Sequence, residues 1–321
     1  MKKLEKIQKV KGKRFLFKVE TSKKPDDYEK YEELRCEVWG DPRDNFPGKR
    51  NMECENFFSL GNCLFIAVYV EDEKGRLRED IDHFVGFSYG FATVKDKQVA
   101  FRKLDNIIFY SLYTAVKKNF QSSGLGILIK EFQRETVLDI FGIQAVSCTY
   151  DPLTGINAYR NIHHFGMEVL EYKEALYKDF AGYLNRVDIP CDRFLIFWDL
   201  RRKVERLDYD LDLLLKSGNL AVSSEIVEVR GRSGPLRIEV VKEVNLHLET
   251  ECLLIEIPYD FYFMLQETNI PQLEVRNIPL QWRMATRRAF QTYFKKKYKV
   301  IDFRWFEIQG RKRDFYVLKK L

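Results

Sequence analysis

A glycine-rich turn between two apolar runs is the feature that most constrains this sequence. The first run, 107–116, is IIFYSLYTAV, whose β-branched and aromatic residues favour a buried strand. The second run, 143–150, has the same character. Between them, apolar residues recur every three or four positions, as on one face of a helix, and Gly142 follows as a helix terminator. Strand, turn, helix and strand in this order predict a βαβ unit.

The helix between these runs is expected to have one packed face and one solvated face. The packed face is predicted from residues spaced three or four positions apart, namely Leu125, Ile129, Phe132, Thr136 and Ile140. Lys130, Gln133 and Arg134 fall between these positions, and we expect them to point toward solvent.

The turn before the helix, QSSGLG at 121–126, has a chemistry of its own. The first backbone N–H groups of a helix have no partner within it, and glycine at 124 and 126 lets a ligand approach them closely. These amides and the helix dipole suit a diphosphate. An ordinary glycine turn before a core helix would have the same sequence, and a single GxG pattern does not distinguish the two interpretations.

Two common phosphate motifs fit this turn poorly. A Walker loop requires Gly-Lys-Ser/Thr at the helix start, but Gly126 is followed by Ile127. A dinucleotide fingerprint requires a third small residue where Ile129 stands, and an acid at the end of the next strand, to which Asp151 corresponds only loosely.

A third motif matches the turn and continues beyond it. Gln121-x-x-Gly124-x-Gly126 after a strand resembles the pyrophosphate loop of the GNAT acetyltransferases, in which Q/R-x-x-G-x-G/A holds the diphosphate of acetyl-CoA. Further elements resemble one branch of that superfamily: VWGD at 38–41, FVGFSYGF at 84–91, TYDPL at 149–153, NAYRN at 157–161, FG at 165–166 and DRFLIFW at 192–198. Together they span roughly residues 30–200 and are more specific than any single element.

The resemblance implies an α/β (mixed α+β) fold of GNAT type, with a mixed sheet flanked by helices. It also implies an acyltransferase in which an amine directly attacks acetyl-CoA or another acyl-CoA, without a metal. The residues implied as cofactor contacts lie in the strand, the turn and a later helix: Thr114, Ala115, Val116, Gln121, Ser122, Ser123, Gly124, Leu125, Gly126 and Asn157. For Asn157, capping its own helix is the alternative.

The usual proton-transferring groups of the family have no match here. Its acid, a Tyr four residues before the helix-ending glycine, corresponds to Ile162, and the His that often follows the strand Ser corresponds to Leu112. The strand 107–116 holds no carboxylate. The catalytic candidates therefore lie beyond the second strand: Asp151, Tyr150 and Asn161. Because Asp151 precedes a proline, it could instead be a helix N-cap, and both roles stay open.

Length and composition predict about two domains. The chain has 321 residues, 45% of them hydrophobic, which is enough for a sizeable core. We expect a GNAT-type acyl-CoA-binding domain at 1–200 and a smaller α+β extension at 201–321, which a degenerate second GNAT-like half would also explain. No segment approaches the about 20 apolar residues that span a bilayer, and the start lacks the apolar region of a signal peptide, so we expect a cytoplasmic protein.

Local patterns predict the remaining segments. Residues 1–13 are expected to form a fraying basic arm, and 41–62 a loop that borders the acceptor side of the site. The segments 63–70 and 83–94 are expected to form an antiparallel hairpin, and the charged segment 201–216 a helix.

The net charge of +6 is unevenly distributed. Residues 281–321 contain 13 Lys/Arg and 3 Asp/Glu, a local charge of +10. Basic residues interleaved with aromatic ones could bind nucleic acid, but a solvated helix face is the commoner explanation. The six cysteines form no CxxC or Cys/His cluster, which indicates neither a zinc site nor a disulfide framework.

These patterns favour one function and leave two alternatives. The favoured hypothesis is an N-acetyltransferase that acts on an amine, either a small molecule or a peptide, as a monomer or homodimer without a membrane partner. The unmatched acid and base favour instead a CoA-binding sensor or scaffold with little turnover. The third hypothesis, which we favour least, is a nucleic-acid-associated protein that binds through 281–321.

Overall fold

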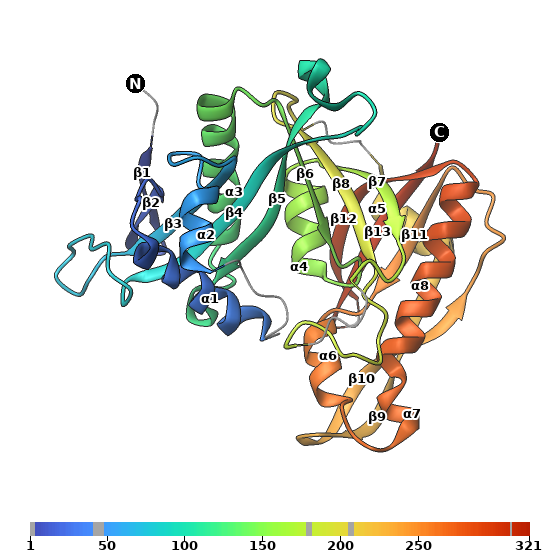
Figure 1. Ribbon diagram of the computed structural model, residues 1–321. Helices are drawn as coiled ribbons and strands as arrows, with labels where there is room; N and C mark the ends of the chain where they lie inside the picture. The colour runs from blue at the N-terminus through green and yellow to red at the C-terminus, as the bar shows by residue number, and fades with distance from the viewer. Residues whose placement is uncertain (1–3, 41–47, 178–181, 205–208, 309) are drawn as a thin grey trace. The chain divides into compact units, whose positions relative to one another are not determined.

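The chain forms two compact units (Figure 1). A computed structural model describes residues 4–40, 48–177, 182–204, 209–308 and 310–321. Unit 1 comprises Met1–Cys148 and Asp199–Arg202, and unit 2 comprises Thr149–Trp198 and Lys203–Leu321. This division differs from the expected boundary at residue 200, because the segment Thr149–Trp198 groups with the C-terminal part of the chain.

A mixed sheet is the framework of unit 1. Its strands are β1 (Glu5–Val10), β2 (Lys13–Val19), β3 (Cys63–Val70), β4 (Phe84–Val94), β5 (Ile107–Val116) and β6 (Ala145–Tyr150). They lie in the sheet in chain order, and all neighbours are antiparallel except β5 and β6, which are parallel. Strand β6 begins in unit 1 and ends in unit 2. The predicted hairpin and βαβ unit are both confirmed.

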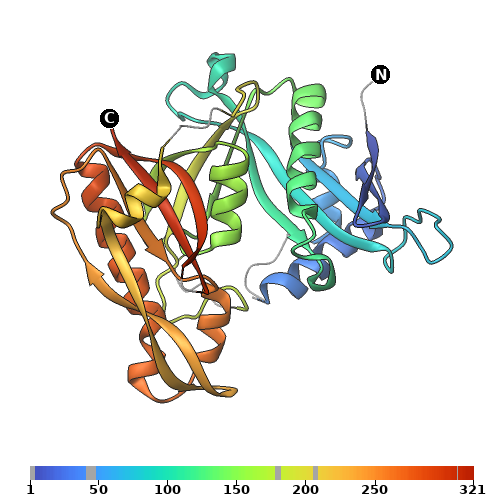
Figure 2. The same ribbon diagram turned by 180° about the vertical axis from the view of Figure 1, so that it is seen from behind.

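Helices cover both faces of this sheet (Figure 1 and Figure 2). One face carries η1 (Pro25–Tyr28), α1 (Glu29–Trp39) and α2 (Lys49–Glu55), and the other carries α3 (Leu125–Thr136) with its π-helical extension η5 (Val137–Phe141). Side chains alternate along a strand. Leu16 therefore packs in the core with Tyr31 of α1, whereas Phe17 contacts Phe132 of α3. Three short 3-10 turns complete the unit: η2 (Ala100–Arg102), η3 (Leu104–Asn106) and η4 (Lys118–Phe120).

The helix α3 follows its predicted packed face, and it ends as expected. All five residues of that face are buried, and Gly142 terminates the helical run with φ +65. Two of the residues expected in solvent are buried too, since Lys130 is 3% and Gln133 is 1% exposed. The prediction that they point toward solvent was wrong. The buried face of α3 is wider than its apolar residues alone indicate, and it includes these two polar side chains.

Two other local expectations for unit 1 need correction. Residues Glu5–Val10 are not a frayed arm but strand β1, which pairs with β2 over six residue pairs. The segment 41–62 contains helix α2 and is not loop throughout. Its residues 41–47, which include the Asp of the VWGD element, lie outside the described residues.

Unit 2 has a second sheet of its own. Its strands are ordered β10 (Gly234–Val244), β9 (Leu220–Gly231), β11 (Cys252–Ile257), β13 (Arg311–Lys320) and β12 (Tyr298–Ile308). Only β9 and β11 are parallel. The unit also contains the antiparallel strands β7 (Glu168–Lys173) and β8 (Arg193–Asp199). Its helices are α4 (Gly155–Ala158), η6 (Tyr159–His164), α5 (Leu211–Lys216), α6 (Phe261–Glu267), α7 (Leu273–Arg276) and α8 (Ile278–Lys295).

Helices pack on both faces of the second sheet. On one face, α8 buries Trp282, Ala289, Phe290 and Tyr293. On the other face, Leu214 and Leu215 of α5 pack against Leu254, Phe315 and Val317. The two faces arise because Phe315 and Val317 alternate with Tyr316 and Leu318 along β13. Of the expected helix at 201–216, the described part of the chain retains only Leu211–Lys216.

The predicted fold class is confirmed, since a large mixed sheet flanked by helices is joined by a second α+β part. In unit 2 the order of helix, strand and strand occurs twice, as η6, β7, β8 and as α8, β12, β13. Among the described residues, no helix is both long and apolar enough to cross a membrane.

Candidate functional site

Strand β5 has a strand neighbour on both sides for only part of its length. Strand β4 pairs with it from Ile107 to Val116. In the described part of the chain, the parallel strand β6 pairs with it only at Phe109 and Tyr110. The predicted pantetheine contacts Thr114, Ala115 and Val116 lie beyond these pairs. Backbone groups on that edge of β5 are therefore available to an extended ligand.

A β-bulge interrupts β5 within this stretch. Tyr89 of β4 pairs with Tyr113, and the next residue, Gly90, pairs with Ser111, so Leu112 has no opposite residue. A bulge redirects the backbone groups of the extra residue and increases the local twist. The bulge thus sets the backbone of Leu112 apart from the regular ladder, at the start of the one-sided stretch.

The turn after β5 leaves its amides open. Gly124 is the N-cap of α3 with φ +91, and Ser122 also has a positive φ of 56. Among the described residues, nothing accepts a hydrogen bond from the backbone N–H of Ser122, Ser123, Gly124 or Gly126. The N–H of Leu125 has only a 3.4 Å contact with Ser123 Oγ. A Cβ on Gly124 would meet no atom within 4 Å. An anion can therefore approach four amides that the protein does not use.

Side chains around the turn fix its shape and add positive charge. Gln121 Nε2 donates to the Val116 carbonyl at 3.0 Å, so this predicted cofactor contact also ties the turn to the strand end. Lys11 Nζ, from the turn between β1 and β2, donates to the Ser122 carbonyl at 3.3 Å. Lys117 and Lys118 lie four and three residues before Gln121. This charge and the α3 dipole both favour a diphosphate.

A polar cluster lies on the α1/α2 side of the sheet, next to the bulge. Tyr89 Oη donates to Glu55 Oε2 at 3.0 Å and lies 3.2 Å from Cys63 Sγ. Burial raises the pKa of Cys63 to about 11. The pKa of Tyr89 is raised by burial, by Cys63 and by Glu55. Sequence reasoning missed this cluster, and its only signal was that Glu55 lies in the segment expected to border the acceptor side.

The opposite face of β5 carries a second polar group. Lys130 Nζ donates to Ser111 Oγ at 2.6 Å and to Gln133 Oε1 at 3.2 Å, and Gln133 Nε2 donates to Ser88 Oγ at 2.5 Å. These contacts join α3 to both β4 and β5. They explain why two polar helix residues are buried, and they hold the helix that begins at the open turn in a fixed register against β5.

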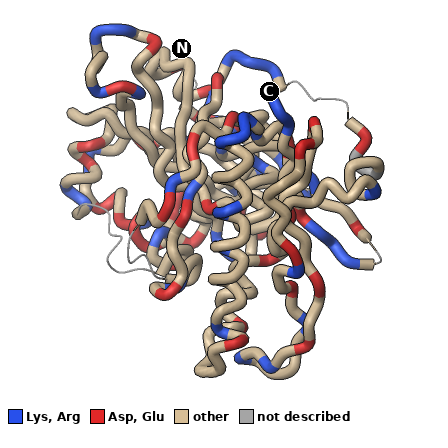
Figure 3. Tube along the Cα trace, turned by 90° about the vertical axis from the view of Figure 1, so that its right-hand side faces the viewer, with Lys and Arg blue, Asp and Glu red and all other residues tan. Residues whose placement is uncertain are grey.

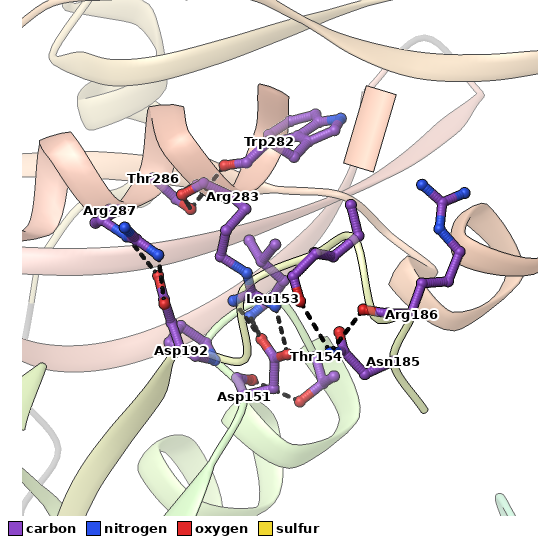
Figure 4. Close-up of polar contacts among 12 residues, drawn as sticks. Asp151, Leu153, Thr154, Asn185, Arg186, Asp192, Trp282, Arg283, Thr286 and Arg287 are labelled. Carbon is purple, nitrogen blue, oxygen red and sulfur yellow. Dashed lines mark hydrogen bonds and ion pairs between the residues drawn. The ribbon is translucent and has the colours of Figure 1, made fainter. Parts of the chain in front are cut away.

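The candidate base Asp151 lies in unit 2 and is committed to an ion pair (Figure 4). Arg283 of α8 donates to both carboxylate oxygens, at 2.8 and 2.5 Å, and Asp151 and Arg283 are 2% and 0% exposed. Asp151 Oδ1 also accepts from the N–H of Leu153 at 2.9 Å. Asp151 is not a helix N-cap either, because α4 begins after Thr154. Both oxygens of Asp151 are therefore bonded to Arg283 inside unit 2, away from solvent.

The other candidates of unit 2 also have structural partners. Tyr150 is buried and lies 3.1 Å, Oη to Oη, from Tyr316. Asn161 is 2% exposed, and its side-chain oxygen Oδ1 accepts from Arg160 Nε at 3.4 Å. Asn157 donates to Thr154 Oγ1 at 3.0 Å and accepts from Arg160 at 2.8 Å. Asn157 therefore does not cap its helix, and its amide is engaged on both sides.

The DRFLIFW element begins with a second buried carboxylate. Asp192 is 0% exposed and accepts from Tyr172 Oη at 2.6 Å, from the N–H of Ala175 at 2.9 Å, and from Arg287 at 2.8 and 2.6 Å (Figure 4). Two motif acids of unit 2 thus pair with arginines one turn apart on α8. Neither arginine belongs to a recognised motif, so sequence comparison could not identify the pairs.

The basic C-terminal segment is largely neutralised by acidic partners. Figure 3 shows acidic and basic positions interspersed along the trace. Within the described residues, ion pairs are formed by eight of the 13 Lys/Arg after residue 280: Arg283, Arg287, Lys296, Arg304, Arg311, Arg313, Lys319 and Lys320. The local charge of +10 is therefore not a continuous basic patch. In the described part of the chain, no three His, Cys, Asp or Glu side chains are grouped as a metal site would require.

Comparison with known proteins found partial similarity to solved acetyltransferase structures. No protein-family model and no curated protein matches the sequence. Among solved structures, Arabidopsis thaliana NAA60 in complex with a bisubstrate analogue is similar over 57% of this chain and 98% of its own, with 10% identity and a TM-score of 0.42. The ribosomal-protein-S18-alanine N-acetyltransferase from Escherichia coli is similar over 60% and 99%, with 9% identity and a TM-score of 0.38.

A third solved structure, a GNAT-family acetyltransferase from Streptococcus pneumoniae, is similar over 56% of this chain and 98% of its own, with 13% identity and a TM-score of 0.38. At such identities the likeness concerns the fold alone.

Proposed function

We propose that this protein is an acyl-CoA-dependent N-acyltransferase, with acetyl-CoA as the expected donor. The observation that carries the proposal is the row of unused amides at the start of α3, directly after a strand that has a one-sided stretch and a bulge. A diphosphate fits the amides, and the amide-containing arm of CoA can bond to a strand edge. The two features are five residues apart, from Val116 to Gln121.

In this proposal the protein chiefly positions the two reactants. Ser122, Ser123, Gly124 and Gly126 hold the diphosphate through backbone N–H groups, as the start of a helix can. The edge at Thr114–Val116 holds the pantetheine arm, which places the thioester toward the bulge at Leu112. The amine nitrogen then forms a bond to the thioester carbon, the C–S bond breaks, and the thiolate takes a proton.

The cofactor half of the proposal is tested by Gly124→Glu, with Gly142→Glu as a matched control. Both glycines have a positive φ and open space around the missing Cβ, so each variant places a side chain of the same size and charge at a left-handed position. Only Gly124→Glu puts a carboxylate at the amides, and we expect its affinity for CoA to fall by about tenfold or more. Calorimetry with CoA measures this. Equal affinity in the two variants would overturn the assignment.

A CoA-binding protein with little turnover is the second candidate. It is favoured by the commitment of Asp151, Tyr150 and Asn161 to buried structural contacts, which leaves the site without the acid or base expected from sequence. Amine-dependent release of free thiol from acetyl-CoA separates the two functions. Thiol release supports the enzyme, and CoA binding without thiol release supports the sensor.

Three further expectations stay predictions. We expect the acceptor to be a small-molecule or peptide amine, the location to be cytoplasmic, and the oligomeric state to be a monomer or homodimer. Nucleic acid is not the expected partner, because acidic side chains pair with most of the basic C-terminal residues. A salt-dependent affinity for RNA or DNA that is lost on deletion of 281–321 would reverse that expectation.

A further inference from the structure

We propose that Glu55 binds the ammonium group of the acceptor and takes its proton, an inference that rests on the proposed acyltransferase function. Glu55 is the last residue of α2, and sequence analysis assigned it no role. It is placed by contacts among α2, β3 and β4, all within unit 1. The same unit contains the open turn and the bulge of β5.

The backbone around Glu55 is tightly fixed. The buried Asn56, which follows it, donates from Nδ2 to the Glu20 carbonyl at 3.0 Å, and the N–H of Phe57 donates to the Cys63 carbonyl at 2.8 Å. A Cβ on Gly61 would lie 1.8 Å from the Glu55 carbonyl oxygen, so only glycine fits where the chain turns back. A carboxylate on such a backbone is held in place without being enclosed.

The carboxylate of Glu55 still has acceptor capacity. Tyr89 Oη donates to Oε2 at 3.0 Å, and Cys63 Sγ contacts the same oxygen at 3.8 Å. Within the described residues, Oε1 has neither a hydrogen-bond partner nor a cationic neighbour, and the side chain is half-buried. An ionised carboxylate offers about four lone-pair sites. Glu55 can therefore accept from an incoming ammonium while Tyr89 orients it.

Aromatic rings connect this carboxylate to the bulge. The Tyr89 ring lies 6.4 Å from that of Tyr113, which is next to Leu112, and the Tyr113 ring lies 5.2 Å from that of Trp39. Trp39 and Tyr113 are half-buried. Aromatic faces with an adjacent carboxylate suit an organic cation, through cation–π attraction and charge pairing. The geometry points to an alkylammonium acceptor, or the α-ammonium of a peptide.

The acceptor nitrogen loses two protons during the reaction, and Glu55 takes the first of them. The ammonium gives one proton to Glu55, and the neutral amine then forms the bond to the thioester carbon. As the C–S bond breaks, the new amide nitrogen loses its second proton, which ends on the departing thiolate, and Glu55 returns its proton to solvent. Cys63 does not act as an acyl carrier, because a buried thiol with a pKa of about 11 stays protonated near neutral pH.

The test compares Glu55→Gln with Glu53→Gln, two residues earlier on the same helix. Glu53 is half-buried and is already contacted by Ser59 and Cys54. Calorimetry on the CoA-saturated protein measures the binding of two probes, butane-1,4-diamine and a tetrapeptide amide with a free α-amino group. Release of free thiol from acetyl-CoA measures turnover with the same probes.

For Glu55→Gln we expect the affinity for CoA to be unchanged. Binding of at least one of the two amine probes should weaken by about tenfold or more. The kcat/KM for that probe should fall by about 100-fold or more, as for loss of a general base. Glu53→Gln should match the native protein within about twofold, and Glu55→Asp should recover part of the loss. The inference is overturned if the native protein binds neither amine, or if Glu55→Gln binds and reacts like the native protein. If the native protein does not bind CoA, the proposed function itself is refuted instead.

Discussion

Asp151 of unit 2 and Glu55 of unit 1 are both carboxylates held by hydrogen bonds. They differ in whether those bonds engage both carboxylate oxygens or only one. Asp151 is 2% exposed and faces a guanidinium that contacts both of its oxygens. Glu55 is half-buried, and the donors that contact it share a single oxygen. A fully satisfied buried acid serves the fold, whereas a partly satisfied one can still serve a ligand. This contrast separates acids that serve the fold from acids that can bind a ligand better than their distance from a motif does.

The sharpest way to break this comparison is Asp151→Asn. We expect it to lower the free energy of unfolding by about 3–5 kcal/mol, because it leaves the Arg283 charge buried without its partner. Urea unfolding monitored by tryptophan fluorescence measures this. The double variant Asp151→Leu/Arg283→Met is the control and should regain much of the loss. A loss below about 1 kcal/mol for the single variant would contradict the structural role of the pair.

A second acid of unit 2, Asp314, should make the stability of the protein depend on pH. Burial raises the pKa of Asp314 to about 7, with further contributions from Glu239 and Glu256. The folded state then holds a proton that the unfolded chain releases near pH 4, so stability is present at low pH and is lost as the pH rises from about 4 to 7. We expect this loss to be about 2–4 kcal/mol and to be absent in Asp314→Asn.

Urea unfolding of native and Asp314→Asn protein at pH 5 and pH 8 isolates the contribution of this group. Asn resembles the protonated acid in shape, so the difference in stability between the two proteins should be much smaller at pH 5 than at pH 8. Glu251→Gln, at an exposed pair with Lys319, is the control and should follow the native curve. Parallel pH dependence of native and Asp314→Asn protein would refute the prediction.

Glu55→Gln should barely change stability, in contrast to Asp151→Asn. Tyr89 can donate to an amide oxygen as it does to a carboxylate, and no cation is left unpaired. We expect the free energy of unfolding to change by less than about 1 kcal/mol. Thermal unfolding measures it. A loss as large as that of Asp151→Asn would place Glu55 among the structural acids and remove the contrast.

The smallest effect is expected where an acid of unit 2 is exposed. Glu174 contacts Arg287 and Gln291, but its side chain is 53% exposed. Because water screens such a pair, Glu174→Ala should cost less than about 0.5 kcal/mol in urea unfolding. The same arginine pairs with the buried Asp192, and Asp192→Ala provides the comparison. An equal loss of unfolding free energy in Glu174→Ala and Asp192→Ala would show that burial does not decide how much these ion pairs stabilise the protein.

The sequence predicted what depends on neighbouring residues. The βαβ unit, the glycine turn and the end of the helical run at Gly142 all follow from local periodicity and backbone freedom. The burial of Lys130 did not follow, because its partner Ser111 lies on a strand 19 residues earlier. The role of Asp151 was also missed, since Arg283 is 132 residues away in sequence and carries no motif.

Strand β6 starts in unit 1 and finishes in unit 2, so residue 200 does not divide the chain into its two units. A protein cut after residue 200 would keep both Asp151 and Asp192 and discard the two arginines that neutralise them. The segment 149–200 therefore cannot be separated from α8 without leaving two buried carboxylates unpaired. Its two buried acids find their partners only after α8 has been synthesised.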